Sequence, residues 1–138
     1  TLWRCVMEKA RQDSCSFRVS GDISDPDRIS ALLGVKPTYT HRKGERRSKF
    51  TEPYPNDMWR YQVSGDDEET LDELLRQIGG VFLEKVEQIK SLIADDGLKV
   101  DVYCSYEFWP NQGGFDFSPQ VLELFTSAGI RLCISIWD

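Results

Sequence analysis

LKVDVYCSYEF, residues 98–108, alternates apolar and polar side chains along its whole length. This period of two is typical of a β-strand with one buried face. Residues 130–136, IRLCISI, repeat the pattern and predict a second strand whose Ile and Leu side chains face the core. An apolar, helix-like segment between Ser118 and Gly129 joins the two. We therefore expect a strand–helix–strand (βαβ) unit at this end of the chain.

The same order of elements occurs near the start of the chain. The alternating residues 15–19 (CSFRV) precede an apolar helix between Asp25-Pro26 and Gly34, and residues 58–63 (MWRYQV) return to a strand. Two βαβ units in one sheet, with the helices packed on one face, resemble the ferredoxin-like fold. The fold class predicted from the sequence is α+β.

A long amphipathic helix is expected between the two units. Its apolar positions recur at helical spacing from Leu71 to Ile93, and the carboxylates of residues 66–69 suit the positive end of a helix dipole. Gly79-Gly80 interrupts the apolar stripe, so we expect a kink or two abutting helices there. The two shorter helices begin at Asp-Pro and Ser-Pro pairs and end at glycines, which are common start and stop signals.

Length and composition indicate a single globular domain. The chain has 138 residues, 40% of them hydrophobic, and a formal net charge of -6. We assign residues 15–138 to one α+β domain that follows an N-terminal extension, residues 1–14. No apolar run reaches the roughly 18 residues that a spanning helix needs, so no membrane association is expected.

The cysteines do not indicate a metal site. Cys5, Cys15, Cys104 and Cys133 lack the CxxC spacing of zinc sites, and the chain has one histidine. We expect no metal or other cofactor, and a reduced, cytoplasmic protein fits this cysteine usage. Cys104 and Cys133 fall inside strands, where a small thiol is usually packed. The sequence leaves open whether these two can pair.

The densest polar segment is the loop from His41 to Lys49. Its cationic side chains are His41, Arg42, Lys43, Arg46, Arg47 and Lys49. Clustered guanidinium groups suit phosphate or carboxylate, and a glycine lets backbone N–H groups approach an anion. The loop lacks the GxxxxGK[ST] spacing of a phosphate-binding loop. Its two interpretations are a site for an anion or a partner, and a solvated loop whose charges pair with carboxylates.

No segment matches a catalytic motif. His41 is the sole histidine, and no second ligand or orienting carboxylate stands at a recognisable spacing from it. No catalytic residue is therefore expected. A hidden hydrolase or transferase site would require a pocket that brings Glu107, Asp116 and His41 within hydrogen-bond reach.

Aromatic side chains gather in residues 106–117, YEFWPNQGGFDF. They can close the core around a tight Gly-Gly turn, or form a rim that grips a partner, because Trp and Tyr dominate interface hot spots. Trp109 and Trp137 are the stronger candidates, since alternation places both on the non-core face of the sheet. Beside them we expect Arg18, Arg60, Gln62, Tyr103, Ser105, Glu107, Arg131 and Ser135. Such a face can bind a partner, form a homodimer or remain hydrated.

Several short motifs, taken together, resemble those of a bacterial family called Domain of Unknown Function 4279. In order they are FRVSGD (17–22), Asp25-Pro26, LLGVKPT (32–38), RKGE (42–45), Trp59, the long central helix, GGF (113–115), Ser118-Pro119 and ISIWD (134–138). The resemblance spans about residues 15–138. It implies no established activity, and some relatives are presumed immunity proteins found beside polymorphic toxins.

These observations lead us to expect a small cytoplasmic binding protein without catalytic activity. The resemblance points to an immunity protein that neutralises a cognate toxin by direct binding. An acidic inhibitor would gain association rate and specificity from complementary charge on a basic toxin. The alternative is a module that binds an anionic ligand or nucleic acid through the loop His41 to Lys49. Nucleic acid is disfavoured by the net negative charge, because phosphate contacts require a surplus of Lys and Arg.

Overall fold

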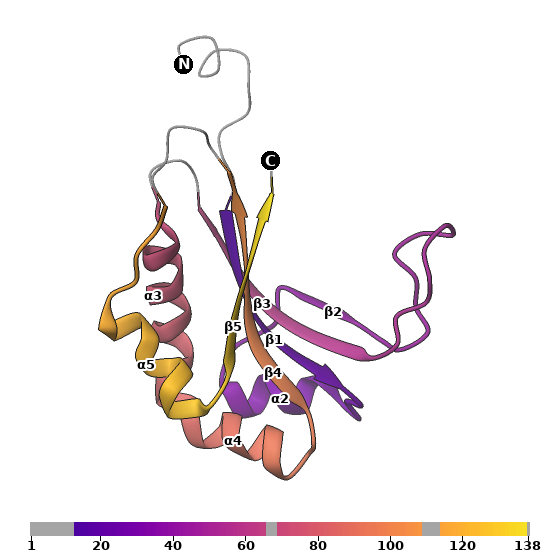
Figure 1. Ribbon diagram of the computed structural model, residues 1–138. Coiled ribbons are helices and arrows are strands. Elements are labelled where there is room, and N and C mark those ends of the chain that lie inside the picture. Colours follow the sequence, from indigo (N-terminus) through magenta and orange to yellow (C-terminus); the bar gives the residue numbers. More distant parts are fainter. Residues whose placement is uncertain (1–12, 66–68, 109–113, 138) are drawn as a thin grey trace.

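The computed structural model describes residues 13–65, 69–108 and 114–137. Within them the chain forms an α+β fold, a five-stranded mixed sheet with helices packed against it (Figure 1). In chain order the elements are β1 (Asp13–Gly21), α2 (Pro26–Leu33), β2 (Tyr39–His41), β3 (Asp57–Gly65), α3 (Leu71–Phe82), the 3-10 turn η1 (Leu83–Lys85), α4 (Val86–Ala94), β4 (Lys99–Glu107), α5 (Pro119–Ala128) and β5 (Arg131–Trp137).

β1 lies at the centre of the sheet, whose strand order is β2-β3-β1-β4-β5. It pairs antiparallel with β3 on one side and with β4 on the other, and β5 runs parallel to β4. α5 connects β4 to β5. The unit expected at the end of the chain therefore has the parallel pairing of a βαβ unit.

The unit expected near the start of the chain is not a βαβ unit, because β1 and β3 are antiparallel. The cause is β2, a strand of three residues that pairs antiparallel with β3. Three residues are too few to show an alternating pattern, so the entry of the chain into the sheet before residue 57 could not be predicted. The strand order also departs from the expected one, and a ferredoxin-like fold is not confirmed.

Side chains that face the helices form one core around Phe17 of β1. The fully buried Phe17 ring stacks on Phe82 of α3 with the ring centroids 3.9 Å apart, and Trp59 of β3 meets it edge-on at 6.4 Å. Trp59 also reaches α2, where its Nε1 donates to Ser30 Oγ at 3.0 Å. Buried residues from α2, α3, α4 and α5 all join this core, so these helices share one face of the sheet.

Both proline-marked helix starts are confirmed. Asp25 caps α2 by accepting the N–H of Asp27 at 3.0 Å, and the helix ends at Gly34 with a φ of 74°. Ser118 precedes α5, but its N–H and hydroxyl both donate to Asp72 of α3, at 2.8 and 3.2 Å. These bonds tie the start of α5 to the first turn of α3.

The central helix is divided, though not where the glycines predicted. α3 starts after its N-cap Thr70 and continues through Gly79-Gly80 to Phe82. The break is η1, directly after Phe82, whose ring is held against Phe17. The central segment is therefore two helices, α3 and α4, but they meet at η1 and not at the glycines. Of the helices in the described ranges, none is long and apolar enough to cross a membrane.

Candidate functional site: an open sheet face with a basic arm

We call the side of the sheet turned away from the helices the open face. The pairing register aligns one side chain from each strand in a row across it. From β2 to β5 the row consists of Tyr39, Arg60, Arg18, Asp101 and Arg131. The open-face positions that alternation predicted for its three arginines are confirmed.

Arg18 and Asp101 form the fixed centre of the row. Nε and Nη2 of Arg18 each donate to a different carboxylate oxygen of Asp101 at 2.8 Å, and Asp101 is only 3% exposed. The Arg18 guanidinium also lies over the ring of Tyr103, 4.6 Å from its centroid. A two-pronged pair of this kind holds both side chains in place, so Arg18 is a structural cation.

Arg60 is held differently. Its guanidinium lies over the ring of Tyr39, 4.4 Å from the centroid, and within the described residues its buried Nε has no hydrogen-bond partner. Arg131, at the β5 end of the row, is exposed. Because the Arg60 Nε is buried, a partner would be contacted through the exposed part of the half-buried Arg60 side chain and through Arg131.

Trp137 lies at the end of the open face near the C-terminus. The residue is 45% exposed, and its Nε1 donates to Ser105 Oγ on β4 at 2.8 Å. This bond holds a large aromatic ring where a partner can contact it. Trp109, the second tryptophan proposed for partner binding, lies outside the described residues.

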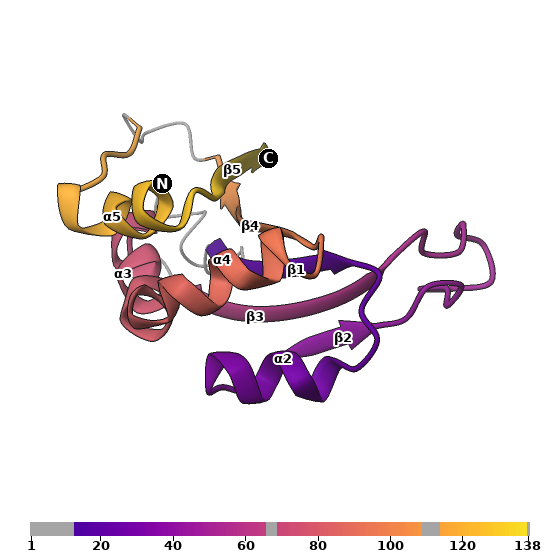
Figure 2. The same cartoon turned by 90° about the horizontal axis from the view of Figure 1, so that it is seen from below.

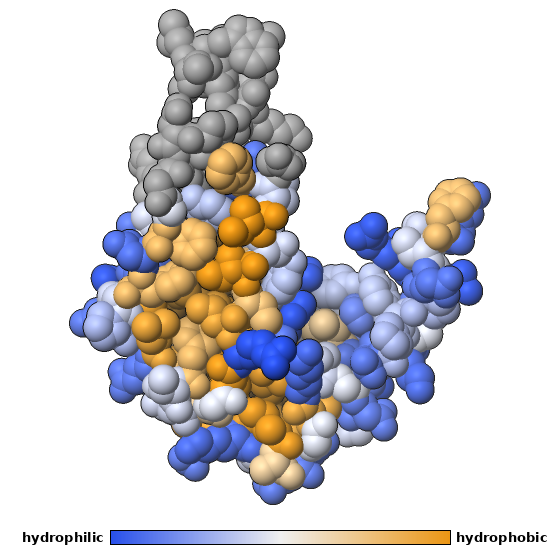
Figure 3. All heavy atoms as spheres, in the orientation of Figure 1, coloured by the Kyte–Doolittle hydropathy of each residue, from blue (hydrophilic) through white to orange (hydrophobic). Residues whose placement is uncertain are grey.

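Residues 42–56 join β2 to β3 as a projecting hairpin that we call the arm. Figures 1 and 2 both show it extending away from the helices, and in Figure 3 it stands clear of the rest of the protein. Near its base, Gly44 N–H donates to Tyr54 O at 2.9 Å and Tyr54 N–H donates to Glu45 O at 2.8 Å. The basic loop predicted from the sequence is thus one half of a hydrogen-bonded hairpin.

The arm carries a net positive charge in an acidic protein. Arg42, Lys43, Arg46, Arg47 and Lys49 outnumber Glu45 and Glu52. Arg46, Arg47 and Lys49 are all exposed. Phe50, beside them, is 87% exposed, with the Nζ of Lys49 5.1 Å from its ring centroid. An aromatic ring held out among cations has no core to fill and is suited to contact with another molecule.

Asp57 fixes the base of the arm to the body. Its carboxylate, with the residue 5% exposed, accepts the N–H of Lys43 at 2.7 Å and that of Ile23 at 2.9 Å. Arg42 Nε lies 3.5 Å from the same carboxylate. The Lys43 N–H is the main cause that lowers the pKa of Asp57, and it outweighs the opposing effect of burial. Of the expected ligand residues, Arg42 is therefore already engaged with a carboxylate of its own chain.

His41 packs at the root of the arm. Its ring stacks on Tyr54 with the centroids 3.6 Å apart, and its Nδ1 lies 3.0 Å from the hydroxyl of Tyr39. Burial is the main cause that lowers its pKa below the ordinary value of 6.5. His41 therefore contributes an aromatic surface and no positive charge at neutral pH.

We predict that an NMR titration of His41 gives a midpoint below 6.5, because the packed ring loses hydration that its cation needs. As the sole histidine, its signal needs no assignment by mutation. In urea the midpoint should return to the ordinary value. Since the unfolded chain takes up the proton more readily, protonation should loosen the Tyr39–His41–Tyr54 cluster as the pH falls below about 6.5. A midpoint above 6.5 in the folded protein would contradict this packing.

Charge is unevenly distributed over the molecule. The described strands place Arg18, Arg60, Lys99 and Arg131 on the open face against Asp101 and Glu107, and the arm adds further cations. The open face and the arm are therefore basic, although the whole chain has a net charge of -6. The expected match between an acidic inhibitor and a basic partner does not suit this face, whose complement is an acidic surface.

The residues considered for a hidden hydrolase site are not brought together. His41 is on β2 and Glu107 on β4, with β3 and β1 between those strands. His41 aligns through Met58 and Ser20 with Lys99, at the opposite end of β4 from Glu107. With strands about 4.8 Å apart and residues about 3.3 Å apart along a strand, the two side chains lie far beyond hydrogen-bond reach.

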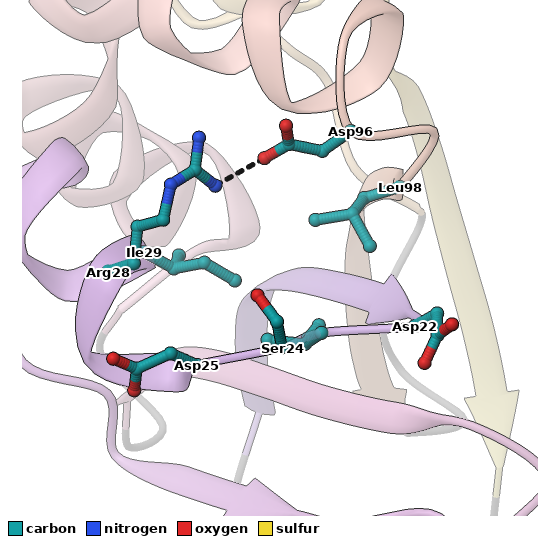
Figure 4. Close-up of a pocket in the computed structure, with 8 residues that line it drawn as sticks. Asp22, Ser24, Asp25, Arg28, Ile29, Asp96 and Leu98 are labelled. Carbon is teal, nitrogen blue, oxygen red and sulfur yellow. Dashed lines mark hydrogen bonds and ion pairs between the residues drawn. The ribbon is translucent and has the colours of Figure 1, made fainter.

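A hollow of about 270 Å³ lies between the end of β1, the start of α2 and the turn after α4 (Figure 4). Its lining residues are Asp22, Ile23, Ser24, Asp25, Arg28, Ile29, Asp96 and Leu98. Arg28 and Asp96 point toward one another across it and form an ion pair that ties α2 to the turn after α4. The lining has neither histidine nor cysteine, and we assign the hollow a structural role.

The cysteines in the described residues are divided between the two faces of the sheet. Cys15 and Cys104 are opposite each other on β1 and β4, both fully buried, with their Sγ atoms 2.8 Å apart. Cys133 pairs in register with Tyr103, one residue before Cys104, and therefore points to the open face. The pairing of Cys104 with Cys133 that the sequence left open is thus disfavoured by geometry.

Sequence reasoning missed three contributors to this site: Tyr39, Tyr54 and Asp57. Their signals were weak, since a tyrosine in a polar loop or an aspartate before a strand has many ordinary explanations.

A sequence profile described as "Domain of unknown function (DUF4279)" matches residues 9–138 of the chain. No curated protein and no solved structure shows significant similarity to it.

Proposed function

Because the chain belongs to the DUF4279 family, whose description assigns no activity, we propose a function from the surface itself. The protein binds another protein through the arm and the open face and performs no chemistry on it. The observation that carries this proposal is the exposed tip of the arm, where the 87% exposed Phe50 is flanked by cations.

The parts of this surface suit a protein partner in different ways. Phe50 and Trp137 offer apolar anchors, and Arg46, Arg47, Arg60 and Arg131 offer donors around them. Aromatic and arginine side chains are the types most enriched at binding hot spots. The predominance of cations requires an acidic complement, and complementary charge raises the association rate.

We propose further that the partner is a toxin encoded beside this protein, which would make the chain an immunity protein. The family resemblance supplies this reading. In that role the arm would reach over the toxin while the open face covers an acidic surface that the toxin needs for its action. The protein would then block the toxin sterically, and its affinity for the toxin alone would determine how well it protects the cell.

The second candidate is a site for an anionic ligand or a nucleic acid, favoured by the exposed cations of the arm, Arg46, Arg47 and Lys49. The salt dependence of binding distinguishes the two. Phosphate contacts release counterions, so nucleic-acid binding would weaken steeply between low and moderate salt. A protein interface with apolar anchors would weaken far less.

We predict that Arg46→Glu combined with Arg47→Glu weakens binding to the product of the neighbouring gene by at least about tenfold, because both cations face a partner of opposite charge. Size-exclusion chromatography of the co-expressed pair and a titration of the purified proteins measure this. Lys85→Glu with Lys90→Glu, the same charge change on the helix side, should leave affinity within about twofold.

The proposal has clear failures. If the two products form no complex and co-expression does not relieve toxicity, the immunity role is wrong. If short RNA or nucleotides bind and the arm variant abolishes that binding, the second candidate replaces it.

A further inference from the structure

β5 is an edge strand with an unpaired side. Within the described residues its sole neighbour in the sheet is β4. Phe108 N–H donates to Trp137 O at 2.6 Å, so the carbonyl of Trp137 points toward β4. Because backbone groups alternate along a strand, those of Leu132, Ile134 and Ile136 point outward, away from β4. These outward N–H and C=O groups are free to pair with another strand.

Nothing in the sequence of β5 blocks such pairing. Edge strands are usually protected by proline, lysine, a bulge or an inward-pointing charge. β5 reads RLCISIW and contains neither proline nor lysine. Ile136 is 58% exposed and Trp137 45% exposed. Figure 3 shows apolar residues gathered over β5 and α5. An apolar surface of this extent is unusual for a sheet edge that stays exposed to water.

The side chains of β5 are complementary to a second copy of the same strand. If two copies pair antiparallel about a twofold axis, all seven residues of β5 are paired in one register alone, the register centred on Ile134. That register sets Leu132 opposite Ile136 of the second copy on the helix side. On the open face it sets Arg131 opposite Trp137 of the second copy, where a guanidinium can lie over an indole ring.

We propose that the protein forms a twofold dimer in which β5 of each copy pairs antiparallel with β5 of the other, centred on Ile134. The three residues with outward backbone groups then make hydrogen-bonded pairs with their counterparts, and each such pair exchanges two N–H···O=C bonds. The two sheets join into one continuous sheet, and the exposed Ile136 side chains are covered.

This dimer leaves the arm free for the proposed partner binding. The arm extends from β2 and β3, at the opposite side of the sheet from β5. Both arms and the open-face residues of β2, β3 and β1 stay accessible after the strands pair, whereas Arg131 and Trp137 lie in the dimer contact. A dimer would present two arms, so a partner with two binding positions would be held with increased avidity.

The first test is sedimentation equilibrium of the purified chain. We expect a monomer–dimer equilibrium with a dissociation constant on the order of micromolar. Ile136→Lys places a charge opposite Leu132 of the second copy and should weaken the dimer by at least about tenfold. Leu122→Lys, on α5 and 38% exposed, is the control for a general loss of apolar surface and should weaken it less. A chain that stays monomeric at concentrations on the order of 100 µM overturns the proposal.

The second test fixes the register by a cross-link. Centring on Ile134 sets Cys133 opposite Ser135 of the second copy, in a non-hydrogen-bonded pair whose Cα separation of about 4.5 Å suits a disulfide. Ser135→Cys should therefore give a covalent dimer on oxidation, seen as doubled mass on a non-reducing gel. Adding Cys133→Ser to that variant should abolish it. A dimer that does not cross-link, or that still does so without Cys133, would show that the copies pair elsewhere.

Discussion

Replacing Asp57 with Ala is expected to lower the free energy of unfolding by about 3 kcal/mol, because two hydrogen bonds to a charged acceptor are lost. The lost bonds are those from the N–H groups of Lys43 and Ile23, at 2.7 and 2.9 Å. Asp57→Asn keeps one acceptor oxygen and should cost about half as much. Urea denaturation followed by circular dichroism measures both.

The cost of Asp57→Asn should depend on pH in a defined direction. The folded protein holds the pKa of Asp57 below its ordinary value of 3.8, since the Lys43 N–H favours the charged form. The stability that this provides is present above the unfolded pKa and is lost as the pH falls through the folded value. The difference between wild type and Asp57→Asn should therefore narrow below about pH 4.

We also expect Asp57 to keep the arm attached to the body of the protein. Without it, residues 42–56 should detach from the body before the sheet unfolds. Trypsin would then cut after Arg46, Arg47 or Lys49 faster than in wild type, at temperatures where the circular dichroism spectrum is unchanged. Glu52→Gln, an exposed carboxylate in the same arm, should change neither stability nor cleavage by more than a small amount. Equal cleavage in Asp57→Ala and wild type would show that Asp57 does not anchor the arm.

An alternating sequence pattern reveals the long strands of this sheet but not the short one. Alternation located β1, β3, β4 and β5, because each turns apolar side chains toward the core on one face and is long enough to show a period. It failed for β2, whose three residues show none. Without β2, the direction of the chain between β1 and β3 could not be inferred, and a false βαβ unit resulted.

The functional surface was only partly predictable for a related reason. Alternation shows on which face a residue such as Arg18 lies, but the neighbour across a strand pair depends on register. The row across the open face was therefore invisible. The cluster of cations in the arm could be recognised in the sequence. Its anchor could not, because the hydrogen bond from the Lys43 N–H to Asp57, 14 residues later, forms only in the folded protein. The net charge of the whole chain likewise does not reveal that cations and carboxylates lie on different sides of the molecule.

Arg18→Met is expected to destabilise the protein by about 3 kcal/mol, because it strips the nearly buried Asp101 of its cation. Both N–H···O bonds of the pair, each 2.8 Å long, are lost together. Because the Arg18 side chain is 26% exposed, we expect a loss of stability at the low end of the range for breaking a buried ion pair. Equilibrium unfolding in urea gives the measurement.

A double variant separates the pair from the sheet around it. Arg18→Met combined with Asp101→Leu should recover most of the lost stability, because no uncompensated charge remains and both side chains are apolar. Arg60→Met is the matched control in the neighbouring strand. Its guanidinium stacks on Tyr39 and its Nε makes no hydrogen bond to lose, so we expect a cost of about 1 kcal/mol.

These variants also distinguish structural from binding arginines on one face. Arg18→Met should reduce stability while the affinity of the folded fraction for a partner changes little, since its donors are taken by Asp101. Arg60→Met should show the reverse: nearly normal stability and weakened binding. If Arg60→Met proved as destabilising as Arg18→Met, its donors would be engaged within the fold. Arg60 would then not be among the cations that the open face offers to a partner.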